Sequence, residues 1–201
     1  MSRLDKKDLT KYATRRNGAD MILEDNQYVN VVVRGLIFNE GHILVTEWKT
    51  SGNSFGIGGR VDFGEAVVDS LQREMREEIG VEVTVRKLLY FSENLFRAAD
   101  GRMAHELGWY FWVEPEGEIC ALGEILPNPD HPDLIIRWLK MDQEQLDNFW
   151  PRTIRHYLLT DFVENFKNNP PNIHSRALDE EDLTIREIEA MFSASVRRDL
   201  D

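Results

Sequence analysis

Three glutamates recur at a spacing that gathers their side chains on one surface. Glu74, Glu77 and Glu78 lie within residues 66–79, where apolar residues follow a helical period. On a helix, residues at i, i+3 and i+4 project from one side, so the three carboxylates lie close together. Their negative charges repel one another unless a cation lies among them. Mg²⁺ and Mn²⁺ prefer oxygen ligands of this kind, so the spacing indicates a divalent-metal site.

The buried face of this predicted helix overlaps with the glutamates. At about 100° per residue, the apolar arc that faces the core contains Val67, Val68, Leu71, Met75 and Ile79. Glu78 falls within this arc, and Glu74 and Glu77 lie along its flank. Burying an unpaired charge costs several kcal/mol or raises the pKa until the group is neutral. A bound divalent cation would remove both penalties.

A glycine-rich connection precedes the helix. Residues 49–64 contain Gly52, Gly56, Gly58, Gly59 and Gly64. Because glycine allows close backbone approach, backbone groups of this connection can reach the same site. The alternative is a solvated acidic helix face with Arg73 and Arg76 as partners of the glutamates. The overlap of the glutamates with the core face argues against that alternative.

The segment from Gly58 to Val81 resembles the Nudix box. That motif has Gly, five residues, Glu, seven residues, Arg-Glu, an aliphatic residue, any residue, Glu-Glu, any residue, Gly and an aliphatic residue. Its fixed positions are occupied here by Gly59, Glu65, Arg73, Glu74, Met75, Glu77, Glu78, Gly80 and Val81. A chance match has a probability on the order of 10⁻⁵. One departure is Ile57, where many family members have proline, and it touches no expected ligand.

The resemblance implies metal ligands at Glu74, Glu77, Glu78 and the Gly58 backbone carbonyl, with Mg²⁺ or Mn²⁺ as the cofactor. It implies that Glu65 supports the metal ligands and that Arg73 holds a glutamate through a charge-assisted hydrogen bond. A metal-activated water would then attack a phosphorus atom.

A carboxylate must accept the proton of this water. In the box, Glu74 and Glu77 are the candidates. In the loop beyond residues 106–113, Glu124 is the first candidate and Glu118 the second, although a loop glutamate by itself is more often only solvated.

The expected reaction is hydrolysis of a pyrophosphate bond. Its substrate would be a nucleoside diphosphate linked to another group, such as ADP-ribose or a nucleotide sugar, or a nucleoside triphosphate. Arg34, Phe55 and Arg60 are candidate substrate contacts, although Arg34 could also point to solvent. One alternative is a Nudix-fold module that binds nucleotides without catalysis, against which the complete set of glutamates argues. Another is an isomerase on the same fold, for which Cys120 is an unconvincing catalytic residue.

The resemblance covers about residues 28–166 and implies an α+β fold, an α/β/α sandwich with a mixed β-sheet. We expect an N-terminal extension over 1–27, a Nudix domain over 28–168 and a C-terminal helical extension over 169–201. The periodicity predicts strands over 28–38, 43–48, 81–96, 106–113 and 134–139, a loop over 123–133, and helices over 66–79, 142–148, 153–166 and 183–196.

The composition excludes several classes of function. The 201 residues carry a formal net charge of −12 and no basic stripe, so we expect no nucleic-acid partner. No apolar run approaches membrane-spanning length, no secretory signal is visible, and Cys120 is the single cysteine. We therefore expect a cytoplasmic protein with a small nucleotide-like substrate. The apolar stripe of the last predicted helix could pack on its own domain or form a homodimer.

Overall fold

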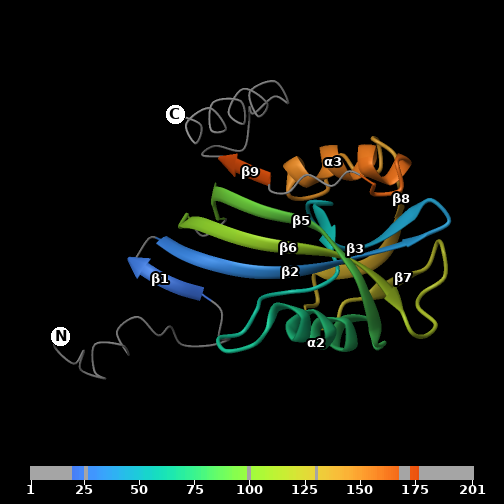
Figure 1. The fold of residues 1–201 in the computed structure, drawn as a ribbon, viewed down its shortest axis with the longest axis horizontal. Coiled ribbons are helices and arrows are strands. Elements are labelled where there is room, and N and C mark those ends of the chain that lie inside the picture. The colour runs from blue at the N-terminus through green and yellow to red at the C-terminus, as the bar shows by residue number, and fades with distance from the viewer. Residues whose placement is uncertain (1–19, 25–26, 99–100, 130, 168–172, 177–201) are drawn as a thin grey trace.

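A computed structural model describes residues 20–24, 27–98, 101–129, 131–167 and 173–176. In this part of the chain a mixed β-sheet lies between two helices, α2 (Val67–Ile79) and α3 (Arg152–Val163), on opposite faces (Figure 1). The expected α+β sandwich is therefore confirmed. No helix of the described residues is long and apolar enough to cross a membrane.

The sheet has nine strands. In chain order they are β1 (Asp20–Glu24), β2 (Gln27–Asn39), β3 (His42–Trp48), β4 (Ser54–Gly56), β5 (Val83–Arg97), β6 (Met103–Pro115), β7 (Ile125–Pro127), β8 (Leu134–Lys140) and β9 (Ile173–Arg176). Seven of them follow the order β7-β8-β3-β2-β6-β5-β9, while β1 pairs with β2 and β4 with β3. The β2–β6 and β5–β9 pairs are parallel and the others antiparallel.

Alternate residues of the central strands enter two separate cores. Leu36 of β2 packs with residues of α3, such as Leu158, whereas the next residue, Ile37, packs with Leu71 and Met75 of α2. This division follows from the strand geometry, because successive side chains point to opposite faces of a sheet. Each helix therefore covers its own face.

Several predicted elements differ from the structure. Residues 142–148 form consecutive turns instead of a helix. The segment is too short to propagate a helix without strong support, and the Asp142 side chain accepts a local hydrogen bond from the Gln145 N–H at 2.9 Å. The predicted loop over 123–133 contains β7. The predicted helix over 183–196 lies outside the described residues.

Both predicted extensions contribute strands to the sheet. β1 lies within residues 1–27 and β9 within residues 169–201, and each adds to a long strand of the central sheet. Short strands of this kind are difficult to predict because the partner strand supplies their hydrogen bonds and their sequences carry little pattern.

Val68 is also exposed, with 40% of its surface accessible, although it was expected to face the core. Its helical angle nearly matches that of Met75, seven residues later. Val68 is therefore exposed because it lies in the first turn of α2, beyond the contact between the helix and the sheet, and not because of its angle around the helix axis.

Candidate active site

Helix α2 lies close to the sheet because β2 has a glycine beneath it. A Cβ atom at Gly35 would lie 2.5 Å from the Met75 side chain and 3.3 Å from that of Leu71. The helix ends at Gly80, whose left-handed φ of 73° lets its N–H donate to the Arg76 carbonyl at 3.1 Å. Burial of Leu71 and Met75 thus directs one flank of α2, with its glutamates, toward the glycine-rich connection.

Arg73 is at the centre of an ion-pair network along this flank. Its guanidinium donates two hydrogen bonds to the Glu65 carboxylate, both at 3.0 Å. It also donates to Glu74 at 2.7 Å and to Glu77 at 2.9 Å. Paired, charge-assisted bonds of this kind fix geometry as well as charge. The hydrogen bonds from Arg73 lower the pKa of Glu65, and the hydrogen bond to Glu65 is the largest effect that raises the pKa of Arg73.

Glu74 is the most buried of the three glutamates, with 7% of its surface exposed. Burial raises its pKa despite the neighbouring Arg73. Its carboxylate lies against the backbone of Gly59, where an added Cβ atom would be 2.5 Å from Glu74 Oε1. A side chain at position 59 would therefore displace this carboxylate.

Glu78 lies against the preceding residue of the same connection. Its Oε2 atom accepts hydrogen bonds from the Gly58 N–H at 3.3 Å and from the Thr46 hydroxyl at 3.2 Å. Burial raises the pKa of Glu78 to about 7, although the charge of Arg34 acts in the opposite direction. Near neutral pH this carboxyl group therefore exchanges readily between its protonated and charged forms.

The connection keeps its position by pairing with β2. The Val33 N–H donates to the Gly59 carbonyl at 2.9 Å, and the Gly35 N–H donates to the Ile57 carbonyl at 2.7 Å. Gly58 has a φ of 133°, and a Cβ atom there would lie 2.4 Å from the Val33 carbonyl oxygen. Only glycine can adopt this positive φ and also fit in the space at this position.

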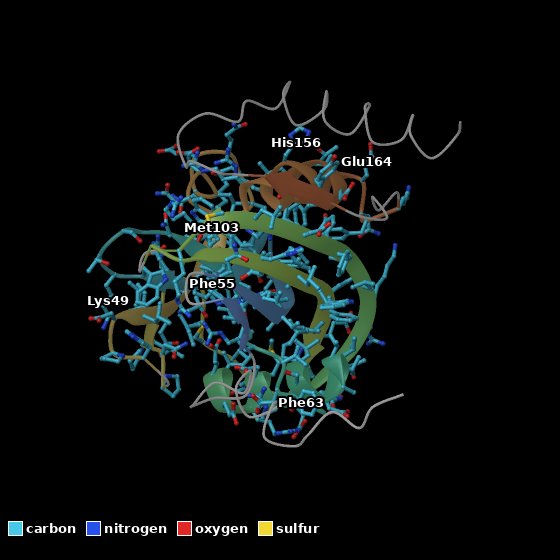
Figure 2. The ribbon with its side chains drawn as sticks, turned by 90° about the vertical axis from the view of Figure 1, so that its left-hand side faces the viewer. Lys49, Phe55, Phe63, Met103, His156 and Glu164 are labelled. Carbon is cyan, nitrogen blue, oxygen red and sulfur yellow. The ribbon has the colours of Figure 1, made fainter. Side chains whose placement is uncertain are left out.

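Arg34 extends from the face of the sheet where α3 packs and contacts the glycine-rich connection. Its guanidinium donates to the Gly58 carbonyl and lies 4.6 Å from the centre of the Phe55 ring. Arg34 is half-buried, so it does not simply point to solvent. In Figure 2, Phe55 lies level with the sheet, between the two helices. Arg60, in contrast, is exposed, and its carbonyl accepts a hydrogen bond from Arg73 at 3.1 Å.

The carboxylate and carbonyl oxygens of this site are the kind of ligand that a hard divalent cation prefers. Glu74 and Glu78 approach adjacent glycines, and burial raises the pKa of both, so a cation near them would stabilise their charged forms. Among the described residues, however, no three acidic, histidine or cysteine side chains already surround a common point. Arg73 holds Glu74 and Glu77, while Glu78 accepts from the backbone. Metal binding would therefore exchange some of these contacts for metal–oxygen bonds.

The loop candidates lie in separate surroundings. Glu124 is exposed, and its carboxylate accepts a hydrogen bond from the Ala121 N–H at 3.0 Å, as in a local turn. Glu118 is also exposed, whereas Cys120 is half-buried and burial raises the pKa of its thiol. The sequence did not predict the contact between Thr46 and Glu78. Its only signal was the presence of a polar residue within the apolar strand of residues 43–48.

Comparisons with known proteins identify relatives of this chain. A family model described as NUDIX domain matches residues 29–160. The CTP pyrophosphohydrolase of Escherichia coli (strain K12) is 31% identical over 83 residues, which are 39% of this chain and 59% of that protein. The matched region thus spans less than two thirds of that relative.

Two solved structures are also similar to this chain. The mutator MutT protein from Bacillus halodurans has a TM-score of 0.52 at 16% identity, over 77% of this chain and 94% of that one. A MutT NUDIX hydrolase from Burkholderia pseudomallei has a TM-score of 0.44 at 24% identity, over 57% and 84% of the two chains. The family model covers most of this chain and includes the glutamate-bearing helix, so the protein belongs to the NUDIX family.

Proposed function

We propose that this protein is a divalent-metal-dependent hydrolase that cleaves a pyrophosphate bond in a small nucleotide. The observation that carries the proposal is the placement of Glu74 and Glu78 against the adjacent glycines 59 and 58. Two carboxylates whose pKa values are raised by burial would be a cost to the fold unless the protein uses them.

We assign metal binding and the positioning of the ligands to different groups of the site. Glu74, Glu77, Glu78 and the Gly58 carbonyl would hold the Mg²⁺ or Mn²⁺ ion. When held by these groups, a divalent ion would supply activation of water and neutralisation of charge on the phosphates. Arg73 keeps Glu74 and Glu77 side by side through its two hydrogen bonds.

Two further residues complete the proposed assignment. Arg34, half-buried beside the Gly58 carbonyl, contacts a substrate phosphate. Of the two box candidates for proton acceptor we favour Glu74, which is buried beside Gly59, over Glu77, which is exposed. Glu124 is the weaker candidate because its carboxylate completes a turn of its own loop.

The substrate class that we propose is a nucleoside triphosphate, or a nucleoside diphosphate linked to another group. The similarity to an enzyme named CTP pyrophosphohydrolase supports the first of these. Reaction at either type of substrate breaks one phosphoric anhydride bond and leaves a nucleotide with fewer phosphates.

A nucleotide panel tests this proposal. Purified protein is incubated with nucleoside triphosphates, ADP-ribose and nucleotide sugars in Mg²⁺ or Mn²⁺, and the released phosphates and nucleotides are measured. We expect turnover of at least one substrate, its loss with a chelator, and a large loss in Glu77→Gln. Glu82→Gln is the matched control, because Glu82 is exposed and pairs with Arg76 at 2.9 Å just beyond the helix. Binding without turnover of any substrate would instead indicate a nucleotide-binding module.

A further inference from the structure

A second group of polar side chains lies on the face of the sheet where α3 packs. Asn30 of β2 is directly opposite Glu106 of β6, and Glu106 is opposite Asn94 of β5. The alternation along β2 that places Leu36 against α3 places Asn30 on the same face. These residues are near the ends of their strands that extend past α3 toward β1 (Figure 1). We call Asn30, Asn94 and Glu106 the polar row.

Two neutral amides hold the carboxylate of this row. Asn30 Nδ2 donates to Glu106 Oε2 at 3.0 Å, and Asn94 Nδ2 donates to Glu106 Oε1 at 3.4 Å. Both asparagines are buried, whereas Glu106 is partly exposed. The carboxylate is therefore fixed in direction by its neighbours and still has free acceptor capacity on both oxygens.

Buried polar atoms beside the row lack partners within the described structure. Asn30 Oδ1 and the hydroxyl oxygen of Ser92 are both buried without a hydrogen bond. Ser92 faces Gly108 in the next cross-strand position, where a Cβ atom would lie 2.9 Å from the Tyr110 ring. An unpaired buried polar atom costs about 1–3 kcal/mol, so a donor that approached these atoms would stabilise the structure.

Arg34 links the polar row to the candidate active site. It follows Asn30 by four residues on the same face of β2, which corresponds to about 13 Å along a strand. Its charge opposes the pKa increase of Glu78 on one side and of Glu106 on the other. A molecule with phosphates beside Arg34 can therefore extend its organic part toward Glu106.

We propose that Glu106 determines substrate specificity by accepting a hydrogen bond from an amino group on the nucleobase. This inference rests on the proposed function, since it concerns the nucleotide that the active site would cleave. Glu106 is the partly exposed acceptor of the row, and an amino group on a heteroaromatic ring can donate an N–H to it. A base with a carbonyl group in that position would place acceptor against acceptor, which a site built for a donor rejects strongly.

Nucleotide binding tests this role without any requirement for turnover. Affinities are measured by calorimetry, in chelator, for two pairs of nucleoside monophosphates that differ in one amino or carbonyl group, CMP with UMP and AMP with IMP. We expect wild type to bind the amino member of at least one pair about tenfold or more tightly, which corresponds to one good hydrogen bond. Glu106→Gln should abolish most of that preference, since an amide presents a donor as well as an acceptor.

The matched control is Glu93→Gln. Glu93 adjoins Asn94 in the same strand, but its side chain points to the opposite face and contacts His105 at 2.7 Å. This variant should keep the wild-type preference.

Four results would overturn the role of Glu106. The first three are no binding of any monophosphate, equal binding within both pairs by wild type, and a preference that survives in a folded Glu106→Gln protein. The fourth is an equal loss of affinity for both members of a pair in Glu106→Gln, which would point to the sugar instead. Because no metal or hydrolysis is involved, these results are independent of the nucleotide panel.

Discussion

The molecule has two groups of carboxylates that are built in different ways. The first, which we call the helix group, consists of Glu74, Glu77 and Glu78. Its members lie on two turns of one helix, and Arg73 donates hydrogen bonds to two of them. The second has a single carboxylate, Glu106, between neutral amides from two other strands. Several charges packed beside an arginine suit exchange with a metal ion, whereas one charge fixed by amides suits recognition of a neutral donor.

This difference separates chemistry from selectivity. If the helix group carries out hydrolysis, its variants should lower kcat for every substrate. If the polar row selects the nucleobase, its variants should change KM for some substrates and leave kcat nearly unchanged.

Glu78→Gln should have the largest effect on the helix group. The amide keeps the size of the side chain but removes the charge that would bind a cation. We expect kcat to fall by orders of magnitude for every substrate that wild type turns over, with the folded structure intact by circular dichroism. Glu106→Gln, assayed in parallel, should retain most of its kcat. If the two variants lost kcat to the same extent, the division between the groups would be wrong.

Gly59→Ala should have the next largest effect. The added Cβ atom would lie 2.5 Å from Glu74 Oε1, so the carboxylate would have to move. A misplacement of about 1 Å at a reacting group can cost about 10²-fold in rate, and we expect a loss of that order in kcat/KM.

The matched glycine variant is Gly41→Ala, in the turn between β2 and β3. Gly41 has a φ of 75° and no atom within 4 Å of an added Cβ. It should lose about 1 kcal/mol of stability from backbone strain and no activity. Equal activity losses in the two glycine variants would exclude a specific role for the Gly59–Glu74 contact.

The last prediction concerns stability, not activity, in metal-free buffer. Because burial raises the pKa of Glu78 from 4.5 to about 7, the folded protein binds a proton more tightly than the unfolded chain does. The free energy of unfolding should therefore fall as the pH rises from about 4.5 through about 7. Glu78→Gln lacks this contribution, so urea titrations should show a stability difference that changes by on the order of 2–3 kcal/mol over this range. Parallel curves for the two proteins would contradict the burial of Glu78.

The helix group was predictable because it lies within one continuous segment. A helical period fixes the relative direction of Glu74, Glu77 and Glu78 without knowledge of any other element. The angles placed Glu78 within the apolar arc and Glu74 on its flank; in the structure Glu78 is half-buried and Glu74 is buried. The family match agrees with the motif. What periodicity could not give was position along the axis, as the exposure of Val68 shows.

The polar row was not predictable because it depends on strand register. Asn30 and Glu106 are 76 residues apart, and a shift of one residue in either strand would separate their side chains. The only signals in the sequence were weak: a polar residue in the apolar run of residues 28–38 and a carboxylate at the start of another predicted strand. The strands β1 and β9 were missed for a similar reason, since partner strands define them.

The central claim is that the helix glutamates surround a divalent cation, and a crystal structure with Mn²⁺ tests it most directly. We predict an anomalous peak in contact with carboxylate oxygens of Glu74, Glu77 and Glu78 and with the Gly58 carbonyl oxygen, with Arg73 displaced from at least one glutamate. A crystal in saturating Mn²⁺ that shows no peak there, with Arg73 still bound to Glu74 and Glu77, would contradict the account.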